Sequence, residues 1–286
     1  MSFHARRPCA PLDACVSALW SVTSAREPHR LERVLPTGAA QLIINLAADR
    51  INTYDAHSGC LLDTTPGSVL AGPRSTVAVI DADAQFDVVG ASVMPGGLPM
   101  LVAAPAHELA EVDVPLERLW PAHVVGRLRD RLRTARTPAA RLDTFEAILI
   151  DQLQRRVLHP AVACALDVFE RHPSTARVDD VVRRSGFSAR YLVDRFKAQV
   201  GLTRKRYCRV RRFQLAVARA HRGLVDEWAD LALDCGFYDQ AHLVNEFRDF
   251  SGGPPTMYLD TRTSHQNHVT FVQSGEPSSE EHGSHD

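Results

Sequence analysis

Hydrophobic residues in the first 115 positions come in short runs that alternate with polar residues and are separated by turn-forming residues. The runs most typical of strands are Arg33–Leu35, Gln41–Leu46, Gly67–Leu70, Thr76–Ile80 and Phe86–Val93. Several short strands at close spacing predict a β-sandwich or barrel. No helical pattern of ten residues separates the runs, which disfavours a doubly wound parallel sheet. We therefore expect a β-rich domain over residues 1–115.

The pattern becomes helical from Leu116 onward. After Pro138, apolar residues fall at i, i+3, i+7, i+11 and i+15, a spacing that places them on one face of a helix. We interpret residues 116–172 as a helical connector that either packs between domains or forms a dimer surface. Residues 263–286 are polar and are expected to form a disordered tail. The apolar residues of the helix are Leu142, Phe145, Leu149, Leu153 and Val157.

An internal repeat occupies the region after residue 172. Eight positions of one unit recur in a second unit about fifty residues later, with a single shift of one residue between them. The repeat preserves turn residues and apolar residues together, which is not expected by chance. The matched pairs are Val181/Leu231, Val182/Ala232, Gly186/Gly236, Phe187/Phe237, Leu192/Leu243, Phe196/Phe247, Gly201/Gly252 and Tyr207/Tyr258.

Each unit has the pattern of a helix-turn-helix. A short helix carries an apolar pair, a glycine permits the positive φ of a tight turn, and an aromatic residue fills the gap between two helices. Ser188 and Asp239 are suitable N-caps for the second helix of each unit. Because Leu192 and Phe196 are four residues apart, they share one face and leave the opposite face exposed. The alternative is a plain helical bundle, in which Gly-Phe is only a turn and a core residue.

Charge is distributed unevenly although the net charge is only −1. Residues 183–222 contain 13 Lys and Arg and one acidic residue (net +12), whereas residues 223–262 contain two Arg and eight acidic residues (net −6). A basic segment of this strength is typical of proteins that bind a polyanion. Lys205, Arg209, Arg212 and Arg219 would form one basic stripe along a connecting helix. Charge and repeat together favour DNA binding over a plain bundle.

These residues resemble the paired helix-turn-helix domain of AraC-type bacterial transcription regulators. The resemblance covers residues 160–262 and is carried by Gly186-Phe-Ser-Ala-Arg-Tyr-Leu192 and Cys235-Gly-Phe-Tyr-Asp-Gln-Ala-His242. It implies two recognition helices, joined by a linker helix, that enter adjacent major-groove segments of double-stranded DNA. Val182 and Arg204 depart from the small residue and the proline usual at these positions. We assign the DNA-binding domain to residues 173–262.

The outward positions of the two recognition helices offer groups suited to base edges, and the basic residues beside them are expected to contact phosphates. A linker helix over Arg204–Ala220 would be ~25 Å long at 1.5 Å per residue, the right scale for neighbouring major-groove segments. The candidate DNA contacts are Ser188, Arg190, Val193, Asp194, Arg195, Lys197, Lys205, Arg206, Arg209, Arg212, Gln240, Ala241, Val244, Asn245 and Arg248.

The N-terminal half is similar to the β-rich domains attached to some of these regulators, through Arg33-Val-Leu-Pro-Thr-Gly38 and Gln41–Leu46. In better-known relatives a cupin-like sensor of small molecules occupies this place. We therefore expect an α+β protein whose N-terminal domain binds a small-molecule effector or forms a homodimer. Arg33, Gln41 and Asn45 either line a pocket or lie on a solvent-exposed strand face. An activator would also contact RNA polymerase, and without a His-x-His pattern no metal or cofactor is expected.

Two alternatives remain open. In the first, the DNA-binding domain is fused to an enzyme that accepts alkyl groups from damaged DNA on a zinc-held cysteine. That chemistry needs four clustered cysteines, whereas Cys9, Cys15 and Cys60 are the only ones in the N-terminal half, so no enzyme activity is predicted. In the second, the protein is an architectural DNA binder without a ligand. With no signal peptide or membrane-spanning run, we expect a cytoplasmic protein.

Overall fold

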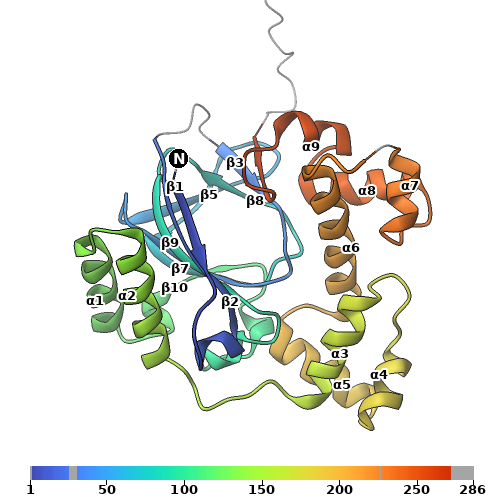
Figure 1. Ribbon diagram of the computed structural model, residues 1–286, viewed down its shortest axis with the longest axis horizontal. Coiled ribbons are helices and arrows are strands. Elements are labelled where there is room, and N and C mark those ends of the chain that lie inside the picture. Colours follow the sequence, from blue (N-terminus) through green and yellow to red (C-terminus); the bar gives the residue numbers. More distant parts are fainter. Residues whose placement is uncertain (1, 26–30, 226, 272–286) are drawn as a thin grey trace, which may run out of the picture.

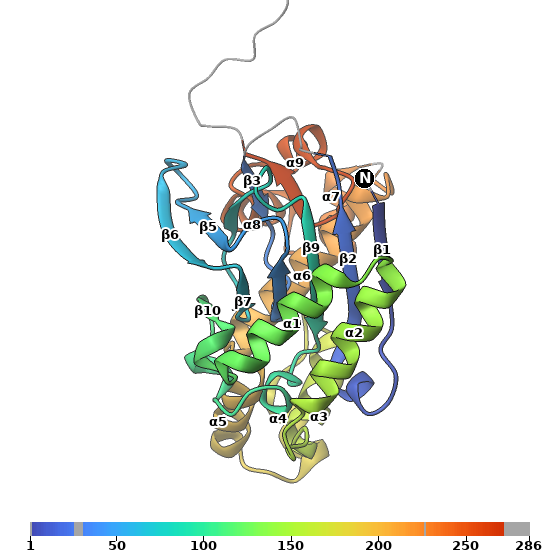
Figure 2. The same cartoon turned by 90° about the vertical axis from the view of Figure 1, so that its left-hand side faces the viewer.

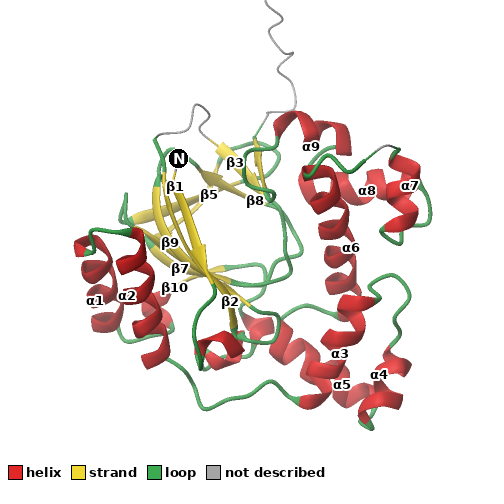
Figure 3. Cartoon of the chain, in the orientation of Figure 1, coloured by secondary structure: helices red, strands yellow, loops and turns green. Residues whose placement is uncertain are grey.

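The computed structural model describes residues 2–25, 31–225 and 227–271, which form a β-rich domain followed by a helical domain (Figure 1). The strands gather in one half of the molecule, as Figure 3 shows, and the predicted α+β fold with an N-terminal β-sandwich is confirmed. The strands are β1 (Ser2–Arg6), β2 (Val16–Thr23), β3 (Leu31–Val34), β4 (Gln41–Asn45), β5 (Arg50–Tyr54), β6 (Leu61–Pro66), β7 (Ser68–Ala71), β8 (Ala78–Asp81), β9 (Asp87–Val93), β10 (Asp113–Pro115) and β11 (His268–Thr270).

A six-stranded antiparallel sheet in the order β1-β2-β9-β4-β7-β10 forms one layer. Successive side chains on a strand point to opposite faces, so Leu42 and Ile44 of β4 are buried on one side while Gln41 and Ile43 point to the other. Two helices, α1 (Ala122–Thr134) and α2 (Pro138–Asp151), cover the first side and share a hydrophobic core with it (Figure 2). These helices therefore belong to the β domain.

The helix expected to extend as far as Val157 is shorter than predicted. Helix α2 ends at Asp151, and Val157 is 78% exposed in the segment that follows. The proposed connector 116–172 is therefore divided between the domains. Its last helix, α3 (Pro160–Arg171), buries Val168 and Phe169 in the core of the helical domain, which begins at Pro160 rather than at residue 173.

A five-stranded antiparallel sheet in the order β11-β3-β8-β5-β6 forms the second layer. Its outermost strand, β11, follows the last helix, so the prediction of a disordered tail over 263–286 is wrong for residues 263–271. Polar composition suggested disorder, but β3 offers an unpaired edge, and Val269 is only 1% exposed beside it. The remaining part of the predicted tail, 272–286, lies outside the described residues.

The helical domain consists of two cores joined by one long helix. Phe196 and Tyr207 lie in the first core with α3, whereas Phe213, Phe247 and Tyr258 lie in the second. None of the helices in the described part of the chain is long and apolar enough to cross a membrane. The helices after α3 are α4 (Val178–Ser185), α5 (Ala189–Val200), α6 (Arg204–His221), α7 (Trp228–Asp234), α8 (Gln240–Ser251) and α9 (Pro255–Thr261).

The helical domain lies directly against the β domain. The side-chain amide of Gln214, on α6, donates a hydrogen bond of 2.9 Å to the carbonyl oxygen of Pro36. At the other end of the contact, a Cβ added to Gly201 after α5 would lie 2.9 Å from Pro73 and 3.0 Å from the carbonyl oxygen of Ala106. Glycine is needed there because the two domains approach too closely for a side chain.

Candidate functional site

The first unit (α4 and α5) is a helix-turn-helix with the predicted turn. Gly186 ends α4 in the left-handed conformation, with φ at 74°, and its N–H donates to the carbonyl oxygen of Val182. Phe187 fills the turn and stacks on Tyr191 at 5.4 Å between ring centres. The hydroxyl oxygen of Ser188 accepts a hydrogen bond of 3.3 Å from the N–H of Tyr191, so it caps α5 as the sequence predicts.

The second unit (α7 and α8) repeats this arrangement. Gly236 has φ at 78°, and the carboxylate of Asp239 accepts a hydrogen bond of 2.7 Å from the N–H of His242 to cap α8. The second unit also meets the loop that precedes the first, because a Cβ added to Gly236 would lie 2.3 Å from the Cβ of Ser174 in that loop. This contact restricts how the units sit relative to each other.

Both recognition helices bury the residues expected to face inward and expose those expected to face outward. Leu192 and Phe196 of α5 are 2% and 3% exposed, and Leu243 and Phe247 of α8 are fully buried. On α5, the predicted contacts Ser188, Arg190, Val193, Asp194, Arg195 and Lys197 are exposed. On α8, the predicted contacts surround one shallow hollow, which is lined by Gln240, Ala241, Val244, Asn245 and Arg248.

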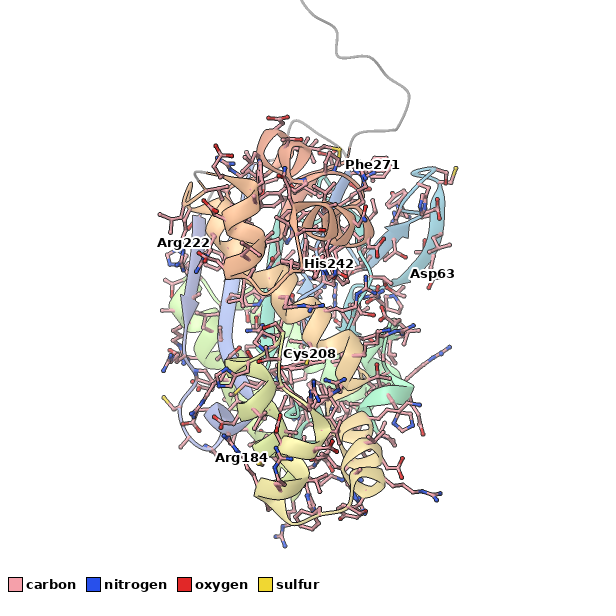
Figure 4. All side chains as sticks on the ribbon, turned by 90° about the vertical axis from the view of Figure 1, so that its right-hand side faces the viewer. Asp63, Arg184, Cys208, Arg222, His242 and Phe271 are labelled. Carbon is pink, nitrogen blue, oxygen red and sulfur yellow. The ribbon has the colours of Figure 1, made fainter. Side chains whose placement is uncertain are left out.

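Figure 4 shows the two units on one face of the molecule. Arg184 of the first unit, Cys208 of α6 and His242 of the second unit follow one another along this face. Helix α6 has 18 residues and is therefore ~27 Å long at 1.5 Å per residue, close to the length expected from the sequence. One polypeptide thus carries two recognition helices at a fixed separation.

The predicted basic stripe on α6 is only partly available to DNA. Arg209 donates from Nε to Glu246 and from Nη2 to Asp249, each at 2.8 Å. Burial acts to lower the pKa of Arg209, but these carboxylates outweigh it and keep the pKa raised. The guanidinium of Arg212 is half-buried, with its carbon 5.5 Å from the ring centre of Phe237.

An acidic residue of the second unit also pairs with the last arginine of the predicted stripe. Arg219 forms an ion pair with Asp234 at the end of α7, whereas Lys205 and Arg206 at the start of α6 are exposed. Part of the positive charge of residues 183–222 is therefore neutralised by acidic residues of segment 223–262 within the same domain. The sequence could not reveal this, because the partners are distant along the chain and their approach depends on the fold.

A cavity of about 390 Å³ lies between the two sheets, on the side of the six-stranded sheet opposite α1 and α2. Apolar side chains from both sheets form most of its wall, and residues 265–268 close one end. The principal apolar lining residues are Trp20, Val22, Val34, Leu35, Ile43, Ile51, Val69, Ala71, Ala78, Ile80 and Val88.

Only one of the three pocket residues proposed from the sequence lines this cavity. Gln41 points into it, but Arg33 occupies the opposite face of β3, is 3% exposed and packs against Gly252 and Phe271. Asn45 is fully buried at the end of β4, where its side chain makes four hydrogen bonds to backbone groups. Arg33 points away from the cavity because its neighbours Glu32 and Val34 point into it. The side chain of Asn45 instead binds the backbone of the turn after β4.

Four charged or ionisable groups of the cavity that were not predicted from the sequence occur as two pairs. Arg74 forms an ion pair of 2.7 Å with Asp113 of β10, and His268 Nδ1 lies 2.7 Å from a carboxylate oxygen of Glu32. The available signal was the acidic residue within each apolar strand, but the sequence does not identify the partner. Among the described residues, no group of three or more His, Cys, Asp or Glu side chains is placed to hold a metal ion.

Two families of known domains match separate parts of the chain. Residues 4–115 match a domain of unknown function (DUF6597), and residues 181–261 match a family described as a helix-turn-helix domain. No curated protein matches the sequence.

Similar solved structures include ToxT from Vibrio cholerae, with 9% identity, 91% of this chain and 98% of that chain covered, and a TM-score of 0.48. A probable AraC family transcriptional regulator from Rhodopseudomonas palustris has 22% identity, 36% of this chain and 96% of that chain covered, and a TM-score of 0.33. The repeat, its two turns and the family match together identify residues 181–261 as an AraC-type helix-turn-helix domain, the DNA-binding part of a transcription regulator.

Proposed function

We propose that the whole chain is a sequence-specific transcription regulator that reads an asymmetric DNA site with α5 and α8 and responds to a small molecule bound in the β domain. The observation that carries the proposal is the outward face of α8. Gln240 and Asn245 carry amide groups suited to adenine edges, and Val244 between them suits a thymine methyl. These residues surround one hollow, while their neighbours Leu243 and Phe247 hold the helix in place.

The cavity between the sheets supports the second half of the proposal. Its volume of about 390 Å³ is at the small end of sites for organic ligands, ~300–1,000 Å³. Its wall is mainly apolar with a few polar groups, the usual composition of such sites. A ligand that occupied it would contact both sheets.

The alternative of an alkyl-accepting enzyme is not supported by the cysteines. A nucleophilic thiol needs a lowered pKa, supplied by a metal or by neighbouring positive charge. Burial instead raises the pKa of Cys15 to about 11, and burial also raises the pKa values of Cys208 and Cys235. We therefore assign these three thiols to packing rather than to accepting alkyl groups.

Selection of bound fragments from random DNA tests the proposal. The full chain should enrich one asymmetric sequence, and Asn245→Ala should cost ~1–3 kcal/mol at one base pair and relax the preference there. Arg190→Ala should do the same at a base pair about one helical turn away. Exposed Gln154, which lies outside both units, provides the control Gln154→Ala, with unchanged preference. Enrichment without base preference would overturn the proposal in favour of an architectural binder.

A further inference from the structure

We propose that residues 263–271, which we term the roof segment, form part of the ligand site and tie the second unit to it, and that the ligand is an uncharged, mainly apolar molecule. This inference rests on the proposed function, since it names the ligand class and the regulation of the same cavity. Three features of the molecule carry it: the pairing of the roof segment, its connection to the second unit, and the arrangement of charges in the cavity.

The roof segment completes the sheet that forms one wall of the cavity. His268 and Thr270 of β11 pair with Val34 and Glu32 of β3, and hydrogen bonds extend the pairing beyond the strand. The N–H of Leu35 donates to the carbonyl oxygen of Asn267 at 2.8 Å, and the N–H of Phe271 donates to that of Leu31 at 3.0 Å. Because residues 265–268 line the cavity, a ligand beneath them touches this segment directly.

The same segment is firmly connected to the second unit. Residues 263–271 fold back on themselves, with the N–H of Thr263 bonded to the carbonyl oxygen of His268 at 3.0 Å. The hydroxyl of Tyr258, on α9, donates to the carbonyl oxygen of Gln266 at 2.9 Å. Tyr258 is 1% exposed in the core that contains Phe247 of α8. A displacement of the roof segment would therefore move α9 and α8 with it.

A second connection runs through α6. Residues 34–37 line the cavity next to the roof segment, and the carbonyl oxygen of Pro36 accepts the hydrogen bond from Gln214. The side-chain oxygen of Gln214 lies 3.4 Å from the amide nitrogen of Gln266. Gln214 thus joins both edges of this end of the cavity to the helix that links the two units. Both helix-turn-helix units are therefore connected to the same end of the cavity.

The charges in the cavity favour an uncharged ligand. The ion pair between Arg74 and Asp113 and the contact between Glu32 and His268 give each lining carboxylate and the lining guanidinium a partner inside the protein. An ionic ligand would have to displace one of these partners and leave a buried charge unmatched, which is unfavourable. A neutral apolar ligand leaves both pairs intact and covers the apolar wall.

Two dyes with the same ring system test the ligand class on the full chain. N-phenyl-1-naphthylamine is neutral, and 8-anilinonaphthalene-1-sulfonate adds one sulfonate to the same rings. We expect the neutral dye to bind at least tenfold more tightly, as measured by fluorescence titration. Ala71→Phe, which fills the cavity, should weaken neutral-dye binding at least tenfold, whereas Ala139→Phe at an exposed position of α2 should leave it unchanged.

If Ala71→Phe leaves binding of the neutral dye unchanged, the cavity is not the binding site. The effector part of the proposed function is then overturned as well. Binding that is sensitive to Ala71→Phe but favours the sulfonated dye would overturn only the uncharged ligand. The ligand class and the existence of the site are therefore tested separately.

Hydrogen exchange tests the roof segment without relying on a variant. Saturating neutral dye should slow amide exchange in residues 263–271 at least tenfold, while exchange in α1 stays unchanged. Val269→Ala should in turn weaken dye binding several-fold, with exposed Val157→Ala as the matched control. If the dye binds in the cavity and exchange of the roof segment does not change, the roof segment is not part of the site, although the effector cavity stands.

Discussion

The basic residues of α6 differ in what their charged groups contact, and this difference determines which of them can bind DNA. Arg209 is held by Glu246 and Asp249, so its guanidinium has two carboxylate partners within the domain. Lys205 and Arg206 are exposed and make no ion pair with another described residue. A phosphate adds little to a charge that is already matched, whereas it gives an exposed charge a partner.

Alanine substitutions separate the two classes. Lys205→Ala and Arg206→Ala should each flatten the plot of log affinity against log salt concentration by ~0.9, the value for one lost phosphate contact. Arg209→Ala should leave that slope unchanged and lower the free energy of unfolding by about 2 kcal/mol, because Glu246 loses its charged hydrogen-bond donor. Filter binding at several salt concentrations and urea denaturation measure the two effects. A flatter slope for Arg209→Ala would mean that this residue faces DNA.

Glu146 connects the pH dependence of stability to the N-terminal segment. Burial of this carboxylate acts to raise its pKa, but hydrogen bonds from Arg6 and from the N–H of Cys9 outweigh burial and lower the pKa. Its contribution to stability is therefore fully present above the unfolded-state pKa near 4.5 and is lost as the pH falls through the lower, folded-state pKa.

Glu146→Gln should consequently remove part of the acid sensitivity. The variant should be less stable than the parent at pH 7, and the difference should shrink between pH 5 and pH 3, where the parent loses the ion pair. Urea denaturation at each pH measures this. Asp143→Asn is the matched control, because Asp143 also pairs with Arg6 but is 72% exposed and should matter much less. A constant difference between parent and variant at all pH values would contradict the assignment.

Local spacing predicted the orientation of individual residues well where one helix face decided it. Leu192 and Phe196 are buried and Arg190 is exposed, as their positions on α5 require. Spacing could not predict that Arg209 is ion-paired, because its partners lie 37 and 40 residues away. It also could not decide the place of Arg33, since period-two alternation gives two faces of a strand but does not say which one borders the cavity.

At the scale of elements, the two turns of the helix-turn-helix units have the same backbone and different surroundings. Gly186 and Gly236 have φ values of 74° and 78°. A Cβ at Gly186 would meet nothing within 4 Å, whereas a Cβ at Gly236 would meet Ser174 at 2.3 Å. Backbone conformation alone therefore disfavours a side chain at the first turn. At the second turn, the contact with Ser174 disfavours a side chain as well.

The same substitution at both turns should show this difference. Gly186→Ala should lower the free energy of unfolding by ~1–2 kcal/mol, the cost of a left-handed conformation for a residue with a Cβ. Gly236→Ala should cost more, because the added methyl group also meets Ser174. Adding Ser174→Gly to Gly236→Ala should remove this extra loss of stability. The nearest remaining atom of residue 174 would then be its Cα, 3.7 Å from the added methyl group. Urea denaturation of the full chain measures all three variants.

Gly126→Ala is the control, because Gly126 lies inside α1 and a Cβ added there would meet nothing outside the helix within 4 Å. It should stabilise the protein by ~0.5–1 kcal/mol, since alanine is the better helix former. Equal costs at Gly186 and Gly236 would mean that the second unit does not touch the loop before α4 in solution.

Elements with a strong repeating pattern were predictable from the sequence, and short elements that depend on a partner were not. The two helix-turn-helix units and the β-rich half could be read from periodicity and turn residues. Strand β11 has only three residues and forms because β3 presents an unpaired edge. The end of α2 was placed too late, because Leu153 and Val157 continue the apolar spacing after the helix has stopped at Asp151.

For the whole molecule, we expect that one chain carries both of the helices that read DNA in the proposed function. Helix α6 is ~27 Å long, and the β domain contacts it just before its start and at its middle. We expect a monomer to protect an asymmetric site of ~15–20 base pairs, with two protected patches about one helical turn apart. Hydroxyl-radical footprinting of the full chain measures this. One protected patch, or a palindromic site that requires two chains, would contradict it.

The pairing of β11 with β3 also has a consequence for synthesis of the protein. Glu32 and His268 are 236 residues apart, so β3 leaves the ribosome long before the strand that covers its edge. At ~5–20 residues per second, the interval is roughly 10–50 s. During that time the nascent β domain exposes an edge that other chains can pair with. Aggregation during expression should therefore be most severe for chains interrupted between the β domain and residue 268, even when both helix-turn-helix units are intact.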